Sequence, residues 1–299
     1  MEAVVADFQG DQAAGLRRLL GAGQLQAITF VAGCEGVAKS IAVANIGAAL
    51  ARLGKEVLIV DEHTSSDNVA SLFGMSSNYD LLNVVQHEAT LPQVLLQPMA
   101  GLRILQASRA VRKLGRLSAA QQQALLTAMA KLDHPVDVIL VDAAMSHPQG
   151  FSPFGLASRE TVVVVSGNSA SITEAYALIK KISQAYARKH FRILVNKVRS
   201  QPDARSIFDN IAQVAIRRGI AQLDYVGAVP HDEAVKMAGQ FCRPVVVQLP
   251  DSAASIAFRE MAADMLHWGN QERDAGGVEQ FMQQLLHLSQ RVTPNQFRV

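Results

Sequence analysis

Short runs of apolar, largely β-branched residues alternate along the chain with longer stretches rich in alanine and leucine. Several of the short runs are apolar at nearly every position, which is typical of strands buried on both faces of a parallel sheet. These runs span 27–32, 57–61, 102–107, 136–142, 161–166, 192–196 and 225–229. The longer stretches predict helices over 40–53, 119–132, 171–188, 205–218 and 252–268. The alternation indicates an α/β fold with a single doubly wound, mostly parallel sheet flanked by helices.

Both ends of the chain fall outside this pattern. We therefore expect an arm over 1–24, one α/β domain over 25–268 and a C-terminal amphipathic helix over 269–299. Within the domain, Ser171 and Glu174 have the spacing of a capping box that begins a helix. The C-terminal segment places apolar residues on one helical face. Such a face either binds a membrane surface or packs on the domain, and the sequence leaves both open; its candidate membrane residues are Phe281, Met282, Leu285 and Leu286.

The composition favours a near-neutral globular protein. Of 299 residues, 49% are hydrophobic and 18% charged, which excludes a disordered chain or a fibre. The net charge of +2 comes without a concentrated basic stripe, so no nucleic-acid partner is expected. The two cysteines, Cys34 and Cys242, are too few for a disulfide framework. Without a signal-peptide pattern or a long apolar run, we expect a cytoplasmic protein, at most peripheral at the inner face of the membrane.

The segment directly after the first predicted strand has the spacing of a phosphate-binding loop that leads into a helix. In such a loop backbone N–H groups surround the phosphates, a lysine neutralises them and a Ser/Thr hydroxyl binds Mg²⁺. Lys39 and Ser40 stand at the last two positions, but Ala38 replaces the second glycine of G-x-x-x-x-G-K-[ST]. A Cβ there disfavours a positive φ, so we expect weak nucleotide binding. The alternative is that Lys39 caps a surface helix without a ligand. The candidate cofactor-binding residues of the loop are Gly33, Gly36, Val37, Ala38, Lys39 and Ser40.

This loop and the stretch up to Asp61 resemble the deviant phosphate loop K-G-G-x-G-K-[ST] of the MinD/ParA ATPases. Further motifs, over 169–180, 195–198 and 227–232, resemble the flagellar branch of that family, known as FlhG or FleN. The resemblance implies a P-loop NTPase fold and the cofactors ATP and Mg²⁺. It also implies that Lys39 binds phosphate and that Asn196 faces adenine, with Mg²⁺ at Ser40, Asp61 and Asp142.

Three departures from the family pattern concern hydrolysis. Cys34 replaces the lysine that in the family reaches across a dimer, His63 replaces the water-orienting aspartate of D-x-D, and the glycine usual after Asp142 is absent. Phosphoryl transfer depends on positioning and charge, so these losses predict slow or absent turnover. The catalytic residues stay unknown, with Asp61 and Asp142 as candidates. The alternative is an active ATPase switch that dimerises with ATP and associates with membrane.

Two of the substituted residues have a second interpretation each. His63 could act as a substitute base, although a lone histidine in a loop more often contacts solvent. Cys34 could be a redox-sensitive thiol, although a small residue that fills a vacated lysine position is the simpler interpretation.

The resemblance also implies partners. In the flagellar branch a D-Q-A-x-x-L-R helix contacts and activates FlhF, a signal-recognition-type GTPase that places flagella. The matching residues are Asp11, Gln12, Leu16 and Arg17; a helix docked on its own domain is the alternative. We expect a regulator of flagellar number or placement whose further partners are a flagellar transcription activator or a switch-complex protein, a second copy of the chain, and weakly a membrane surface.

Overall fold

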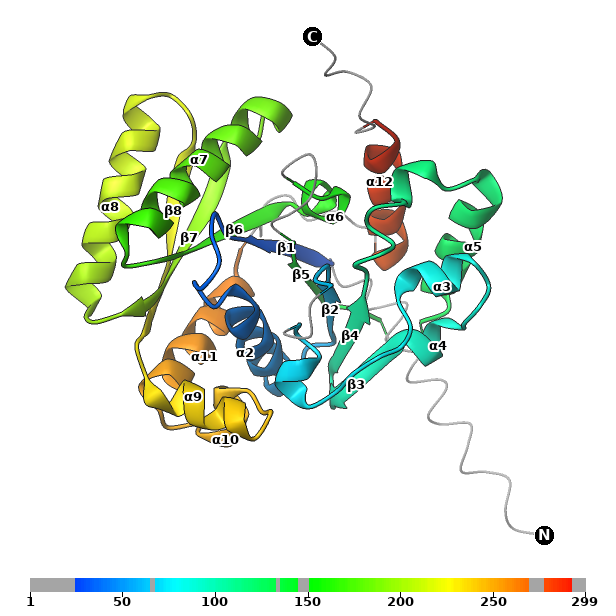
Figure 1. Cartoon of the computed structure of the whole chain (residues 1–299), viewed down its shortest axis with the longest axis horizontal. Helices are drawn as coiled ribbons and strands as arrows, with labels where there is room; N and C mark the ends of the chain where they lie inside the picture. The colour runs from blue at the N-terminus through cyan, green and yellow to red at the C-terminus, as the bar shows by residue number, and fades with distance from the viewer. Residues whose placement is uncertain (1–24, 65–67, 133–134, 145–150, 269–276, 292–299) are drawn as a thin grey trace.

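The structure is a computed structural model that describes residues 25–64, 68–132, 135–144, 151–268 and 277–291. Eight strands form one sheet in the order β3-β4-β2-β5-β1-β6-β7-β8 (Figure 1). All neighbouring pairs are parallel except β3 and β4, which are antiparallel. The strands are β1 (Gln26–Val31), β2 (Val57–Asp61), β3 (Leu95–Met99), β4 (Leu102–Gln106), β5 (Val138–Asp142), β6 (Glu160–Ser166), β7 (His190–Val198) and β8 (Gln222–Pro230).

Helices cover both faces of the sheet, as expected for a doubly wound fold (Figure 1). On one side lie α2 (Lys39–Arg52), α9 (Glu233–Gln240), α10 (Val245–Gln248) and α11 (Ala253–Met265). On the other lie α3 (Leu81–Val85), α4 (Leu91–Val94), α5 (Ala119–Ala130), α6 (Pro153–Ala157), α7 (Ser169–Tyr186), α8 (Gln201–Arg217) and α12 (Val278–Arg291). Two short 3₁₀ helices are η1 (Ser71–Phe73) and η2 (Leu114–Arg116).

The central strand β1 shows why its apolar run is continuous. Side chains of successive strand residues point to opposite faces. Ala27 and Val31 accordingly belong to the core under α7 and α12, whereas Ile28 and Phe30 belong to the core under α2 and α11. Both faces are buried, so no polar alternation is needed along the strand.

The predicted sheet is confirmed, with two differences in detail. The edge strand β3 was not predicted, because its sequence LLQPM contains a proline and is only partly buried. The capping box at Ser171 is wrong: α7 begins two residues earlier, and Asn168 is its N-cap through a 2.6 Å bond from the Ser171 backbone N–H. The Ser171 hydroxyl instead accepts a bond from the backbone N–H of Ser166.

Helix α12 is packed against the domain, on α5, α6 and η2. All four residues proposed for a membrane face are buried: Phe281, Met282, Leu285 and Leu286 have exposed fractions of 6%, 1%, 0% and 5%. The ring of Phe281 stacks on Phe154 of α6 at a centroid distance of 6.4 Å. The second of the two alternatives for this face therefore describes the structure, and a membrane-bound state stays a prediction. None of the described helices is long and apolar enough to cross a membrane.

Candidate nucleotide and metal site

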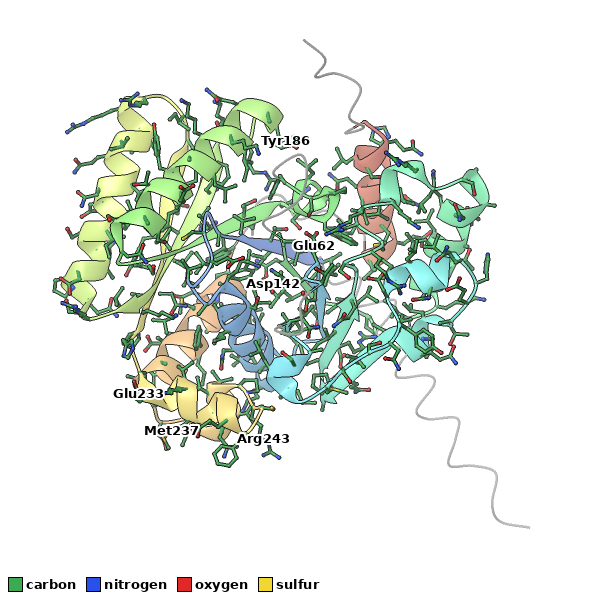
Figure 2. All side chains as sticks on the ribbon, in the orientation of Figure 1. Glu62, Asp142, Tyr186, Glu233, Met237 and Arg243 are labelled. Atoms are coloured by element: carbon green, nitrogen blue, oxygen red, sulfur yellow. The ribbon has the colours of Figure 1, made fainter. Side chains whose placement is uncertain are left out.

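The candidate site lies at the carboxyl ends of the central strands β1, β2 and β5. Strands β2 and β5 are parallel neighbours, and their last residues, Asp61 and Asp142, are paired in register. Asp142 is likewise paired with Phe30 near the end of β1. The loop that follows β1 is thereby placed directly beside both carboxylates. Figure 2 labels Asp142 and Glu62 in this central region of the molecule.

The loop after β1 has the backbone conformation of a phosphate loop in spite of its missing glycine. Gly36 has φ 81°, and Ala38, the N-cap of α2, has φ 59° and lies in the left-handed region. A left-handed backbone costs a non-glycine residue roughly 1–2 kcal/mol. The strain expected from Ala38 is therefore present. Helix α2 begins at Lys39, as the sequence predicts within one residue.

Gly33 is required for close packing, whereas Gly36 is required for its positive φ. A Cβ on Gly33 would lie 2.3 Å from the backbone carbon of Glu174 in α7. No side chain fits in that space, so the first loop position has to be glycine for the loop to pack on α7. Cys34, the next residue, is a half-buried free thiol packed against the core on the α2 side.

Lys39 is buried and paired inside the protein. Its ammonium group forms a close ion pair with Oδ1 of Asp142, and the exposed fractions of the two side chains are 6% and 0%. The Lys39 Nζ also lies 3.4 Å from Nε2 of His63. Lys39 is therefore buried at the start of α2, and its predicted contact with phosphate stays a prediction.

His63 lies between the two aspartates and faces solvent only in part. Its Nδ1 is 3.0 Å from Oδ1 of Asp61 and 3.2 Å from Oδ2 of Asp142, and 22% of the side chain is exposed. Asp61 is held by backbone N–H groups as well: His63 donates to Oδ1 and Val69 donates to Oδ2. Nδ1 of His63 is thus engaged by both carboxylates.

These contacts shift the titration of both partners. Burial alone would lower the pKa of His63, but its contacts with Asp142 and Asp61 outweigh burial and raise the pKa to about 9. Burial alone would raise the pKa of Asp142, but the Lys39 charge and the contact with His63 lower it to about 2. At neutral pH His63 is therefore a cation and Asp142 an anion.

Glu62 is a buried carboxyl beside the cluster that sequence reasoning did not single out. Its exposed fraction is 2%, and its Oε2 accepts a bond from the backbone N–H of Ala144, two residues after Asp142. Burial raises the pKa of Glu62 to about 7, against smaller lowering effects from Ser152, Ala144 and Lys39. In the sequence, only the position of Glu62 between Asp61 and His63 indicates a role for it. A single glutamate at a strand end is usually solvated.

A cavity of about 750 Å³ opens next to the loop, between the ends of β6 and β7 and the start of α8. Its lining includes Gly36, Asn168, Lys197 and Asp203. Asn196 is not part of this lining. Its amide nitrogen donates to the backbone oxygen of Val37 at 2.9 Å, while Lys197 Nζ donates to that of Gly36. Asn196 therefore ties β7 to the loop, and its predicted contact with adenine stays a prediction.

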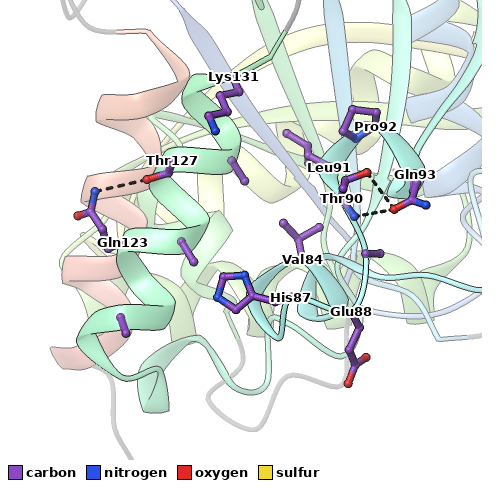
Figure 3. A pocket seen from close by; sticks show the side chains of 14 residues that line it. Val84, His87, Glu88, Thr90, Leu91, Pro92, Gln93, Gln123, Thr127 and Lys131 are labelled. Carbon is purple, nitrogen blue, oxygen red and sulfur yellow. Dashed lines mark hydrogen bonds between the residues drawn. The ribbon is translucent and has the colours of Figure 1, made fainter.

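A second cavity, of about 700 Å³, lies apart from these residues, between α3–α4 and α5 (Figure 3). It is lined by His87, Glu88, Thr127 and Lys131 among others, and hydrogen bonds run from Gln123 to Thr127 and from Thr90 to Gln93. The predicted partner residues of the arm, Asp11, Gln12, Leu16 and Arg17, lie outside the described residues.

The residues fit a nucleotide better than they fit Mg²⁺. The left-handed loop backbone, the helix N-terminus and the adjoining cavity are the elements that bind phosphate and base. Ser40 is in the first turn of α2, where a phosphate loop requires it. Mg²⁺, however, takes oxygen ligands, and here a nitrogen of His63 faces both aspartates. The donor set around Asp61 and Asp142 is thus not the all-oxygen set that Mg²⁺ prefers.

Comparison with known sequences decides the family. The family described as the CobQ/CobB/MinD/ParA nucleotide binding domain matches residues 28–245. The chain belongs to this family. Among curated relatives, the antiactivator FleN of Pseudomonas aeruginosa is 32% identical over 88% of this chain and 94% of its own length. The septum site-determining protein MinD of Bacillus subtilis is 26% identical over 81% of this chain and 89% of its own length.

Solved structures of the MinD/ParA family have the same fold. MinD in the MinC:MinD cell division complex of Aquifex aeolicus matches with a TM-score of 0.63 at 20% identity, over 83% of this chain and 98% of that one. MinD of Pyrococcus horikoshii complexed with Mg-ADP matches with a TM-score of 0.63 at 20% identity, over 82% of this chain and 98% of that one. The predicted family and its P-loop NTPase architecture are therefore confirmed for this chain.

Proposed function

We propose that this MinD/ParA-type protein regulates flagellar number or placement, in the manner of FlhG and FleN. The observation that carries the proposal is the 32% identity with the antiactivator FleN, which extends over 88% of the chain. An antiactivator acts by contacting another protein, so a flagellar transcription activator is the first partner to test. A switch-complex protein is the second.

The test is a flagellar count in the organism that encodes the chain. Deletion should change the number or position of flagella per cell, and the wild-type gene supplied in trans should restore it. A deletion strain with unchanged flagella and unchanged transcription of flagellar genes would contradict the proposal.

The arm supports a contact with an FlhF-type GTPase. Its sequence D-Q-A-x-x-L-R presents Gln12 and Leu16 within one short segment, which is too short to be a stable helix alone. Replacing Gln12 and Leu16 with alanine should abolish stimulation of the GTPase, whereas Gln9→Ala, just outside the motif, should leave it intact. Unchanged stimulation by the double variant would exclude this contact.

The nucleotide site supports ATP binding with slow or absent hydrolysis. The loop backbone and Lys39 are those of a phosphate site, but Lys39 is already paired with Asp142. At the position of the water-orienting aspartate stands His63, whose ring is held between Asp61 and Asp142. Without a carboxylate at position 63, no side chain there orients the attacking water. Without a lysine at position 34, a second subunit does not neutralise the developing charge.

The same site favours a conformational role over a catalytic one. ATP phosphates at the loop would compete with Asp142 for Lys39, because both are anions within reach of one ammonium group. Binding would therefore break a buried ion pair and release the Asp142 carboxylate. ATP-dependent dimerisation and peripheral membrane contact in the cytoplasm belong to this proposal, and the second requires α12 to leave its place on α5 and α6.

A further inference from the structure

Three side chains from β2, β5 and the turn after β2 bring ligand atoms of metal-binding type together. Nδ1 of His63 lies 3.0 Å from Oδ1 of Asp61 and 3.2 Å from Oδ2 of Asp142. One ligand atom from each of the three residues lies within 4.8 Å of the other two. Both aspartates are fully buried, so the atoms converge inside the protein and not on its surface.

The distances from Nδ1 of His63 to the two aspartate oxygens match the distances between neighbouring ligands of one metal ion. Bonds from nitrogen or carboxylate oxygen to a small divalent ion are about 2.1 Å long. Two such ligands at a right angle are then ~3.0 Å apart, and ~3.4 Å apart at a tetrahedral angle. The distances from His63 to the two aspartates fall at and between these values.

Asp142 presents its buried oxygen Oδ2 to this point, where Nδ1 of His63 lies 3.2 Å away. Its Oδ2 is buried and accepts no hydrogen bond from any group in the part of the chain that the structure describes. Lys39 occupies the other oxygen, Oδ1, and so leaves Oδ2 available. A buried carboxylate oxygen that accepts no hydrogen bond is costly, and a bound cation would reduce that cost.

An outer contact holds Asp61 in position. The backbone N–H of Val69 donates to Oδ2 of Asp61 and leaves Oδ1 facing His63. The far nitrogen of the His63 ring, Nε2, lies 3.4 Å from Lys39 Nζ; it carries the ring proton when Nδ1 binds a metal, so both groups are donors there and Asp61 is the ligand that an outer contact holds. Ligands oriented by outer contacts of this kind are characteristic of metal sites.

The donor set decides which ion fits. Imidazole with two carboxylates suits borderline ions such as Zn²⁺, Co²⁺ and Mn²⁺, whereas Mg²⁺ prefers oxygen alone. We propose that Asp61, His63 and Asp142 form a binding site for a divalent transition-metal ion, which is occupied without nucleotide. The site depends on His63, the residue that departs from the D-x-D pattern, and it does not depend on the flagellar role proposed above.

The test is a titration of the full chain with Zn²⁺, Co²⁺ and Mg²⁺ in separate experiments, without nucleotide. The pH is held at 8, because a metal has to displace a proton from imidazole. We expect one Zn²⁺ or Co²⁺ ion per chain and Mg²⁺ binding at least ~100-fold weaker. The Co²⁺ absorption spectrum should show nitrogen and oxygen ligands and no thiolate charge-transfer band.

Two variants assign the site. His63→Gln should weaken Zn²⁺ binding at least ~10-fold, and His63→Asp should shift the preference towards Mg²⁺. Cys34→Ser and Cys242→Ser serve as matched controls for thiol binding and should leave the affinity unchanged. Circular dichroism verifies that each variant is folded. If one of the two His63 variants does not fold, the other still tests the proposal.

Three results would overturn the proposal: no saturable Zn²⁺ or Co²⁺ binding, unchanged Zn²⁺ affinity in folded His63→Gln, or loss of binding in Cys34→Ser. None of them affects the proposed regulatory function, which is read from flagellar number and ATP binding. Equally, a normal flagellar count after deletion would leave this metal site standing.

Discussion

Lys39 and Asp142, 103 positions apart in the chain, form a buried ion pair at the carboxyl ends of β1 and β5. The lysine follows the loop after β1, and the aspartate is the last residue of β5. Without a ligand, the two charges of a nucleotide site thus neutralise each other. His63 adds a third charged group, in contact with Asp142 and close to Lys39.

Removing the lysine should therefore destabilise the nucleotide-free protein. In Lys39→Gln the Asp142 carboxylate stays buried with only His63 to compensate its charge, and breaking one side of a buried pair costs about 3–5 kcal/mol. Urea denaturation measures the loss. The double variant Lys39→Gln, Asp142→Asn should lose less than the sum of the single variants, because the two groups are coupled. Strict additivity would contradict the pairing.

Restoring the loop glycine should strengthen both the fold and nucleotide binding. Ala38→Gly relieves a left-handed backbone and should raise the free energy of unfolding by about 1 kcal/mol. It should also tighten ATP binding, since no Cβ then crowds the phosphates. The matched control is Ala187→Gly at the C-cap of α7, which has φ 55°. That change should stabilise the fold similarly and leave ATP affinity unaltered.

The raised pKa of His63 predicts a loss of stability at alkaline pH. The folded pKa is about 9 and the ordinary value is 6.5, so the stabilisation is complete below pH 6.5 and disappears as pH rises to 9. Glu62, with a pKa of about 7, titrates mainly below this range. The melting temperature of the nucleotide-free protein should fall between pH 7 and 9.5, and the fall should be smaller in His63→Gln. Parallel profiles of the two proteins would contradict the contacts of His63 with the aspartates.

The sheet could be predicted from the sequence because its strands are buried on both faces. Apolar runs such as 57–61 and 136–142 have the length and continuity of buried strands, and all predicted runs are found as strands. The edge strand β3 is half-buried and contains Pro98, so it lacks that signal. The N-cap of α7 was misplaced because Asn168 and Ser171 are both good caps, and only the local bond from the Ser166 backbone N–H to the Ser171 hydroxyl separates them.

The sequence does not reveal the contacts among the candidate site residues. Motif spacing identified Lys39, and the family resemblance implied Asp61 and Asp142, whose strands end side by side in the parallel sheet. Spacing does not reveal that Lys39 turns onto Asp142 or that His63 inserts between two carboxylates. Those contacts depend on charge balance among residues that are distant in sequence. Glu62 was missed for the same reason, because only the fold makes it buried.

The docking of α12 can be tested without changing the helix itself. A Cβ on Gly115 of η2 would lie 2.6 Å from the backbone oxygen of Ser289, so Gly115→Ala should displace α12. If this helix binds membrane, the variant should co-sediment with anionic vesicles more than the wild-type chain does. Gly239→Ala, where a Cβ meets nothing within 4 Å, is the matched control.

Two further comparisons complete the membrane test. A chain that ends at Gly276 lacks the helix and should not co-sediment at all. Equal binding of Gly115→Ala and wild type, with α12 shown to be displaced by increased proteolysis after residue 277, would exclude a membrane role for this face.

The most direct test of a retained but non-hydrolysing nucleotide site is an ATP titration followed by a single-turnover assay on the same protein. The account predicts saturable ATP binding that is lost in Lys39→Gln. It predicts hydrolysis at least ~10³-fold slower than in a relative with both the signature lysine and the D-x-D aspartate. Hydrolysis as fast as in such a relative, and abolished by Lys39→Gln, would contradict it.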